Sequence, residues 1–325
     1  MKIMKLSTAL IVGVSAAAFA ASAAAEEVTL KGVSSFAKAT AFSRPWESFV
    51  EYVNENGKGI LQINYIGGPE AVPPFEVGNA VQSGVVDIAN VTSAYYTNLL
   101  PESDALHLAT TTIQQQRENG CYELINGMHE EKMNVHYLAR TGDGVPFHLY
   151  LAKAIDKPDL SGLTIRTTPV YQAAFQTLGA NLVRTAPGEV YTALERGSID
   201  GYGWPIQGIL DLGWHERTKY RVDPGFYQVD VNFLVNLDTW NKLTDEQRAL
   251  LEEAATRTEE KNAENKEINE EERRKQAEAG IETITFEGAD REKWLQTTQE
   301  AGWAAVMQVN PPMVEELRAC LSPSN

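Results

Sequence analysis

An arginine at the end of an apolar run is the residue that most clearly indicates chemistry in this sequence. Arg166 closes Leu163–Arg166, which predicts a buried strand. A guanidinium there needs an anionic or carbonyl partner, because an unpaired buried charge is very costly. Its planar fork matches a carboxylate with two parallel hydrogen bonds. The residues alone allow two partners for Arg166: a carboxylate of the chain, such as Glu189, or an anionic ligand.

Motifs for covalent chemistry do not support catalysis. The sequence has no G-x-G-x-x-G, P-loop, H-E-x-x-H or G-x-S-x-G pattern. Ser35 and Lys38 match the S-x-x-K of penicillin-recognising hydrolases, but neither K-T-G nor S-D-N accompanies them. The five histidines show no metal-ligand spacing. We therefore predict a binding protein without a cofactor, and a secreted enzyme acting on a small organic acid is the alternative.

The first 25 residues have the composition of a cleavable export signal. Met1–Lys5 is basic, and Leu6–Ala25 is uncharged and ends in three alanines before Glu26. A membrane-anchoring helix is the alternative, but the many alanines make this run weakly apolar. Cleavage after Ala25 would leave 325 − 25 = 300 residues. The pattern predicts a soluble protein of the periplasm.

The acidic composition limits the possible partners. The chain has 28 Lys plus Arg against 44 Asp plus Glu, a net charge of −16. This argues against binding to nucleic acid or to anionic membrane surfaces, which both need clustered cations. No later stretch approaches the length of a transmembrane helix, so we predict no direct membrane insertion. Cys121 and Cys320 would meet an oxidising compartment, which favours one disulfide over two buried free thiols.

Two segments resemble each other at an offset of 189 − 76 = 113 residues. Residues 76–87 (EVGNAVQSGVVD) and 189–200 (EVYTALERGSID) share Glu, Val, Ala, Gly and Asp in register. Each segment predicts a short helix, a glycine stop and a turn into a buried strand. The repeat therefore predicts two lobes of similar α/β topology.

The remaining patterns fill in an α/β fold. Apolar runs predict strands at 28–33, 60–66, 147–151, 163–166 and 232–236, and periodicity predicts helices at 45–56 and 170–178. Thr244–Gln247 is a capping box that begins a helix running from Asp245 to Ala279. Its polar middle lacks the apolar a and d positions of a coiled coil. We therefore predict a long, solvated helix that bridges the two lobes.

The block around Arg166 resembles the substrate-binding proteins of TRAP transporters. The matching residues are 159–166 (DLSGLTIR), Gly179–Ala180 and 187–201 (PGEVYTALERGSIDG), and the resemblance extends over essentially the whole mature chain. It implies a two-lobed periplasmic binding protein fold, with two mixed sheets flanked by helices. It also implies that a small organic anion binds in the cleft and is delivered to the membrane subunits of a permease. Arg166 matches the family's carboxylate-anchoring arginine, which favours a ligand as its partner.

The patterns and the resemblance together divide the chain into segments. The predicted parts are the signal peptide 1–25, lobe I at 26–147 with roughly 237–260 returning to it, lobe II at 148–236, the bridging helix 245–279, and a C-terminal segment 280–325 that packs on the lobes. We predict a monomer. A receptor that feeds a sensor is the alternative to one that feeds a permease.

The residue before Pro205 bears on the class of ligand. Sialic-acid-type members of the family carry Asn there, whereas Trp204 resembles members that bind 2-oxo acids or other monocarboxylates. The resemblance thus favours a monocarboxylate or 2-oxo acid. Some such members hold a metal ion with an acidic residue beside the Trp. Because Gly203 stands there in this chain, we predict no metal ion, and Asp230 is the one remaining candidate ligand for a metal.

The other candidate ligand-binding residues are mostly aromatic or lie near strand ends, where open α/β sheets bind ligands. With Arg166 and Trp204 the predicted set comprises Phe36, Glu70, Tyr95, Phe147, His148 and Thr168. Core packing is the alternative role for Phe36 and Tyr95, and capping a helix is the alternative for Glu70.

Overall fold

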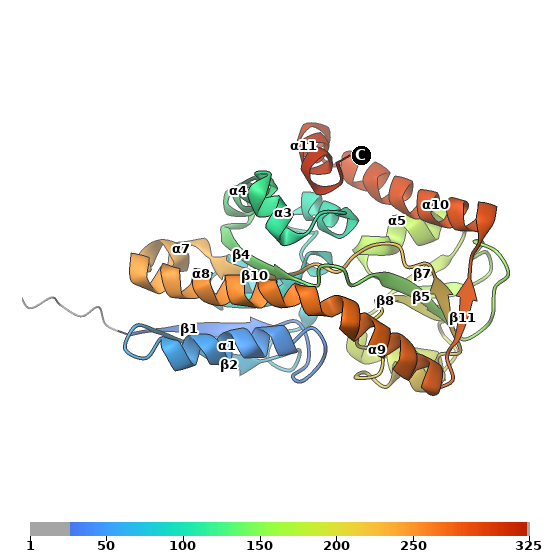
Figure 1. Cartoon of the computed structure of the whole chain (residues 1–325), viewed down its shortest axis with the longest axis horizontal. Helices are drawn as coiled ribbons and strands as arrows, with labels where there is room; N and C mark the ends of the chain where they lie inside the picture. Colours follow the sequence, from blue (N-terminus) through green and yellow to red (C-terminus); the bar gives the residue numbers. More distant parts are fainter. Residues whose placement is uncertain (1–26, 324–325) are drawn as a thin grey trace, which may run out of the picture.

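The computed structural model describes residues 27–323, so the predicted signal peptide lies outside the described residues. Two mixed sheets, each covered by helices, form two lobes (Figure 1). A long helical segment, built from α8 (Asp245–Glu260) and α9 (Asn265–Glu278), runs along both lobes, in orange in Figure 1. Within residues 27–323, no helix combines the length and apolar character needed to cross a membrane.

The first sheet has five strands in the order β2–β1–β3–β10–β4. The pairs β2–β1 and β1–β3 are parallel, whereas β10 is antiparallel to both β3 and β4. The strands are β1 (Val28–Ser34), β2 (Leu61–Gly67), β3 (Ile88–Thr92), β4 (Val135–Thr141) and β10 (Val231–Asn236).

The second sheet has six strands in the order β11–β9–β5–β8–β6–β7. The pairs β7–β6 and β6–β8 are parallel, and β5 is antiparallel to both β8 and β9. The strands are β5 (Phe147–Leu151), β6 (Thr164–Thr167), β7 (Asn181–Arg184), β8 (Gly201–Pro205), β9 (Tyr220–Asp223) and β11 (Glu282–Thr285).

The two sheets share one topology, as the internal repeat predicts. β2–β1–β3–β10–β4 corresponds strand by strand to β7–β6–β8–β5–β9, with the same parallel and antiparallel pairs. In the first sheet the antiparallel strand β10 comes from a distant part of the chain, whereas its counterpart β5 in the second sheet directly precedes β6. The chain therefore crosses between the lobes from β4 to β5, from β9 to β10, and again through α8 and α9 to β11.

The aspartates that end the two repeated segments have the same structural role in both lobes. Asp87 accepts a hydrogen bond from the Lys31 N–H at 2.8 Å, and Asp200 accepts one from the Thr164 N–H at 2.9 Å. The backbone N–H of each aspartate returns a bond to the carbonyl of the same partner. Each aspartate thus anchors the incoming strand to the first strand of its own sheet.

The strand placement changes the predicted lobe boundaries in two places. β10 lies in the first sheet, although the predicted second lobe extended to residue 236. β11 comes from the C-terminal segment and pairs in parallel with β9 at the edge of the second sheet. The C-terminal residues therefore supply a strand as well as helices that pack on the lobes.

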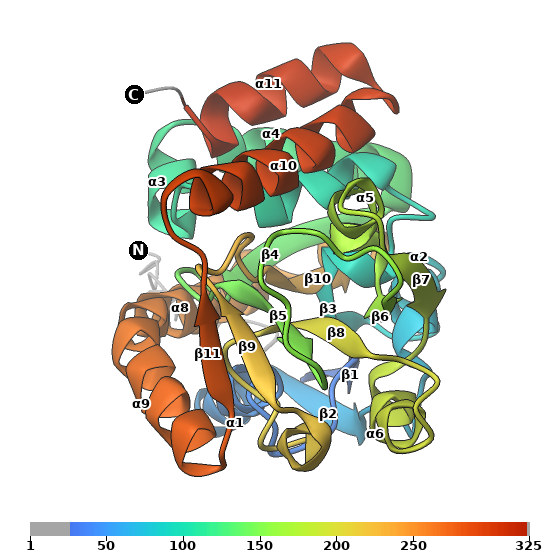
Figure 2. The same cartoon turned by 90° about the vertical axis from the view of Figure 1, so that its right-hand side faces the viewer.

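The other α-helices of the described residues pack around the two sheets. They are α1 (Arg44–Asn56), α2 (Val77–Gln82), α3 (Ile113–Glu118), α4 (Cys121–Met133), α5 (Pro169–Thr177), α6 (Pro187–Glu195), α7 (Leu237–Lys242), α10 (Gly288–Met307) and α11 (Pro311–Leu321). Figure 2 shows α10 and α11, in red, lying over α3, α4 and α5. The apolar stripe predicted for residues 45–56 is buried, with Trp46 and Phe49 packed against Phe233.

The long helical segment differs from the prediction in its middle. Thr244 and Gln247 form the predicted capping box, but a 3-10 turn, Lys261–Glu264, separates α8 from α9. Asn262, Asn265 and Asn269 are not simply solvated. They donate to the carbonyls of Arg140, Asp143 and Gly144, which lie at the first crossing between the lobes. The polar middle therefore fastens the helix to the crossing segment.

Cys121 and Cys320 form the predicted disulfide, which joins the start of α4 to the end of α11 across 199 residues. A cross-link of this span restricts the unfolded chain strongly. We expect Cys121→Ser with Cys320→Ser to lower the free energy of unfolding by roughly 2–4 kcal/mol, measured by urea denaturation. Reductant should lower the stability of the wild type by a similar amount and leave the double variant unchanged. Equal stability of the oxidised wild type and the double variant would contradict this.

Candidate ligand-binding site

A small cavity between the lobes brings together most of the predicted ligand-binding residues. Its volume is about 30 Å³. Of the predicted set, six residues line it: Phe36, Tyr95, Phe147, Arg166, Thr168 and Trp204. The other lining residues are Phe42, Thr92, Ala94, Tyr171, Pro205, Val229 and Val231. Apart from the arginine, this lining is uncharged and largely apolar.

Arg166 is held rigidly in this cavity. Its side chain is fully buried at the end of β6. Nε and Nη2 donate to the Thr185 carbonyl at 3.1 and 2.9 Å, and Nη1 donates to the Tyr171 hydroxyl at 2.7 Å. Tyr171 in turn donates to the Gly203 carbonyl at 2.7 Å. These neutral partners orient the guanidinium but leave its positive charge uncompensated.

The guanidinium retains hydrogen-bonding capacity. It has five N–H groups, of which three are used by Thr185 and Tyr171, so one on each Nη is left. Glu189, the internal partner considered above, accepts from the Ala186 N–H instead. In residues 27–323 no carboxylate forms an ion pair with Arg166. A carboxylate in the cavity would supply the missing charge.

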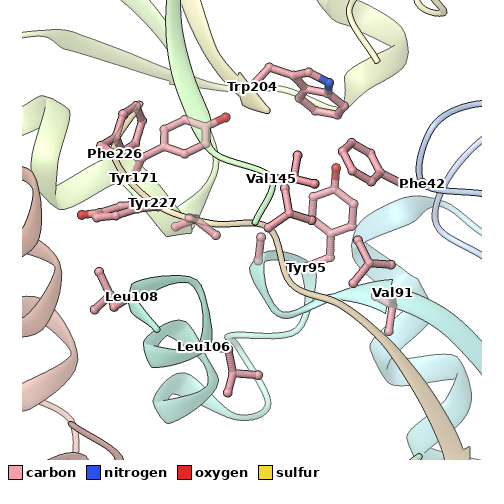
Figure 3. Packing of buried hydrophobic residues seen from close by; sticks show 14 of the residues in the cluster. Phe42, Val91, Tyr95, Leu106, Leu108, Val145, Tyr171, Trp204, Phe226 and Tyr227 are labelled. Atoms are coloured by element: carbon pink, nitrogen blue, oxygen red, sulfur yellow. The ribbon is translucent and has the colours of Figure 1, made fainter. Parts of the chain in front are cut away.

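Aromatic rings form the walls on both sides of the cavity. Trp204 from β8 lies with its ring centroid 5.6 Å from the Arg166 guanidinium carbon and 6.3 Å from the Phe42 ring. The ring centroids of Phe36 and Tyr95, both in the first lobe, lie 6.1 Å apart. In Figure 3 the rings of Phe42 and Tyr95 lie below Trp204. Burial raises the pKa of Tyr95 to about 12, and the charge of Arg166 acts in the opposite direction, so Tyr95 remains a neutral hydroxyl.

His148 does not line the cavity, contrary to the prediction. It follows Phe147 on β5, and successive side chains of a strand point to opposite faces. Because Phe147 faces the cavity, His148 faces the opposite layer, where Nδ1 contacts the Val222 carbonyl and Asp223 at 2.9 Å each. Burial lowers the pKa of His148. Its position indicates a structural role.

Glu70 and Asp230 also lie outside the cavity lining. Glu70 accepts from the Gly68 N–H at 2.8 Å, so it closes the turn after β2 and does not cap a helix, the role considered as its alternative. Asp230 lies between Val229 and Val231, which face the cavity, and so points to the other side of the strand. There it accepts from the Ser93 N–H, and burial raises its pKa to about 6. In residues 27–323 no group of three His, Cys, Asp or Glu side chains is placed to hold a metal ion.

Two further contacts join the lobes outside the cavity. Asp211 of the second lobe accepts from Arg44 at 3.0 Å and from the Ala41 N–H at 2.8 Å. Arg184, at the end of β7, stacks on Phe75, with its guanidinium carbon 4.4 Å from the ring centroid. The lobes are therefore in contact around the cavity, which is the closed arrangement of a two-lobed protein.

A family model for bacterial extracellular solute-binding proteins, family 7, matches residues 34–307. The chain belongs to this family. The predicted resemblance to the substrate-binding proteins of TRAP transporters is thereby confirmed. The match runs from the last residue of β1 to the end of α10, so it includes the other strands of both sheets and the long helical segment.

Curated members of the family are distant relatives. A monocarboxylate 2-oxoacid-binding periplasmic protein of Nostoc sp. is 29% identical over 223 residues, which cover 64% of this chain and 60% of that protein. The match thus spans less than two thirds of the Nostoc protein. A solute-binding protein of Roseobacter denitrificans is 27% identical over 250 residues, covering 74% of this chain and 76% of the relative.

Solved structures of family members have the same fold. A TRAP periplasmic solute-binding protein of Roseobacter denitrificans with bound L-galactonate matches with a TM-score of 0.78 at 22% identity, covering 90% of this chain and 99% of that chain. A Bordetella pertussis extracytoplasmic solute receptor binding pyroglutamic acid matches with a TM-score of 0.80 at 16% identity, with the same coverage. The predicted two-lobed fold with its bridging helix is therefore confirmed.

Several lining residues of this family member were not predicted from the sequence. Tyr171 lies in the first turn of α5, directly after the strand that carries Arg166, so its place in the chain could have suggested it. Val229 and Val231 follow from the alternation around Asp230. Phe42 lies in a turn before α1, where no periodic pattern indicates its direction.

Proposed function

We propose that this protein is the extracytoplasmic substrate-binding subunit of a TRAP-type transporter and that it binds a small monocarboxylate, a 2-oxo acid being one such ligand. The observation that carries the proposal is the buried Arg166, which has two spare N–H groups and no carboxylate partner in residues 27–323. Export across the inner membrane and delivery to the membrane subunits of a permease are parts of this proposal.

The cavity lining supports one carboxylate and an apolar remainder. A second carboxylate would find no second cation among the lining residues, and burying it unpaired would be costly. The many hydroxyls of a sugar acid would meet mainly aromatic and aliphatic side chains. A monocarboxylate satisfies Arg166 and buries its carbon atoms against the rings.

Binding and closure are coupled in this arrangement. Arg166, Thr168 and Trp204 come from the second lobe and Phe36, Phe42 and Tyr95 from the first, so a ligand contacts both lobes only when they meet. A ligand that binds the closed state better shifts the protein towards it. The loaded, closed protein and the empty, open protein would therefore present different surfaces to a partner.

The proposed function is tested by identifying what the protein binds. The exported protein should be purified without added ligand, denatured, and its released small molecules identified by mass spectrometry. Calorimetric titrations should then compare monocarboxylates, dicarboxylates and sugar acids. We expect monocarboxylates to bind at least 100-fold more tightly than the other two classes. Tightest binding of a sugar acid, or chemical turnover of a bound acid, would overturn the proposal.

The contacts of Asp211 should contribute to affinity without touching the ligand. We expect Asp211→Ala to weaken monocarboxylate binding about 3- to 10-fold, because the closed state loses two hydrogen bonds, one of them in a partly exposed ion pair. Calorimetric titration measures this. Glu195→Ala is the matched control, since it removes an exposed ion pair with Arg217 within the second lobe. Equal affinities for the two variants would show that the contacts of Asp211 do not contribute to ligand affinity.

A further inference from the structure

A second, larger cavity lies next to the one that holds Arg166. Its volume is about 270 Å³, and it is bounded by residues of both lobes. The first lobe contributes Ser35, Phe36, Phe42 and Pro74, and the second contributes Ala186 and Trp204. We call this cavity the side chamber. None of the residues that line it is charged.

The side chamber is continuous in its walls with the Arg166 cavity. Phe36, Phe42 and Trp204 line both spaces. The Arg166 cavity, at about 30 Å³, has room for roughly two water molecules, at about 10–15 Å³ each, so it accommodates a carboxylate group and little more. The rest of an acid bound to Arg166 must therefore extend beyond that cavity. The side chamber is the adjoining space.

Two buried polar atoms among the lining residues have no hydrogen-bond partner in the described chain. They are the Ser35 hydroxyl of the first lobe and the Trp204 indole N–H of the second. The Trp204 nitrogen lies near Gly208, another lining residue of the chamber, where an added Cβ would be 3.2 Å away. Figure 3 shows this nitrogen on the edge of the ring away from Tyr95. Buried polar atoms without partners are costly, so these two atoms indicate a ligand with a complementary atom.

We propose that the side chamber holds the remainder of the ligand, and that this remainder is a ring or branched apolar group bearing one neutral hydrogen-bond acceptor. This inference rests on the proposed function and narrows its ligand class. An apolar cavity of about 150 Å³ is known to hold benzene, so 270 Å³ accommodates a six-membered ring with a small substituent. The uncharged lining excludes a second carboxylate or an ammonium group there. The acceptor would receive a hydrogen bond from the Trp204 indole N–H.

The test compares three acids that differ only in what would enter the chamber. Calorimetric titrations use propanoate, 3-phenylpropanoate and 3-(4-methoxyphenyl)propanoate. We expect the ring to raise the affinity at least 10-fold over propanoate, and the methoxy oxygen to raise it about 3-fold more. Trp204→Phe should remove the second gain, because it deletes the indole N–H.

A variant that fills the chamber provides the structural control. Leu212 lines the chamber but not the Arg166 cavity, so Leu212→Trp should abolish the gain from the ring and leave propanoate binding unchanged. Leu210→Trp is the matched control for Leu212→Trp. Leu210 is a partly buried leucine two residues away, and it lines neither cavity. Ala186→Phe fills the chamber from another segment if Leu212→Trp does not fold.

The outcomes separate this inference from the proposed function. If the ring brings no gain in affinity in the wild type, or if both chamber-filling variants keep that gain, the side chamber does not hold the ligand. Propanoate binding that depends on Arg166 would still leave the proposed function standing. If none of the acids binds, propanoate included, the proposed function is overturned and this inference falls with it.

Discussion

Replacing Arg166 by Ala should reduce monocarboxylate affinity by about 100-fold or more without unfolding the protein. Truncating one partner of a buried, hydrogen-bonded charge pair typically costs 2–5 kcal/mol or more, and each 1.4 kcal/mol is a factor of ten. The ligand-free protein should keep its stability, because the hydrogen bonds to Thr185 and Tyr171 are lost together with the cost of burying an uncompensated charge. Calorimetric titration and thermal denaturation without ligand measure the two effects.

Two variants make this result specific to the guanidinium. Arg166→Lys keeps the charge but not the fork that binds a carboxylate through two N–H groups, so it should recover only part of the affinity. Arg196→Ala removes an exposed arginine on the same lobe and should bind like the wild type. Full affinity in a folded Arg166→Ala protein would show that the carboxylate is bound elsewhere.

Replacing Asp143 by Ala should destabilise the protein by roughly 3–5 kcal/mol, the cost of leaving a buried charge without its partner. Asp143 accepts from the Arg140 Nη2 and from the Ile113 N–H, each at 2.6 Å. Arg140 is fully buried, and Asp143 is nearly so. The pair lies at the first crossing between the lobes, so its loss should loosen both lobes together.

Urea denaturation followed by circular dichroism measures the loss of stability in Asp143→Ala. Glu271→Ala on α9 is the control, because it breaks a solvent-exposed ion pair with Arg274, and such pairs contribute little to stability. If both variants unfold at the same urea concentration, the buried pair contributes no more than a surface one.

The fold was predictable from the sequence because its elements follow local rules. The repeated segments specify a glycine stop and an aspartate that anchors the next strand, and both lobes use them in the same way. The polar middle of the long helix was assigned to solvent instead, because a sequence does not distinguish an asparagine facing water from one facing a carbonyl. Asn262, Asn265 and Asn269 belong to the second kind.

The site residues were predictable only where the strand or helix that carries a residue determines where its side chain points. Arg166 and Trp204 lie at the carboxyl ends of neighbouring strands, so the topology brings them together. His148 was assigned to the site together with Phe147, although a strand sends neighbouring side chains to opposite faces. Phe42 was missed because a turn carries no such rule. The side chamber was not predictable, since its walls come from separate segments of both lobes.

The return of β10 to the first sheet also separates the order of synthesis from the order of folding. The first sheet holds the N-terminal strands, but β10 joins β3 to β4 only after residue 236 has been made. Until then the early strands expose an unpaired edge, which is a template for association with other chains. On the proposed export route, the chain would benefit from staying unfolded until β10 has crossed the membrane. A protein cut between β4 and β5 would yield an N-terminal fragment that lacks β10, an interior strand of its sheet, so this fragment should not fold as an independent domain.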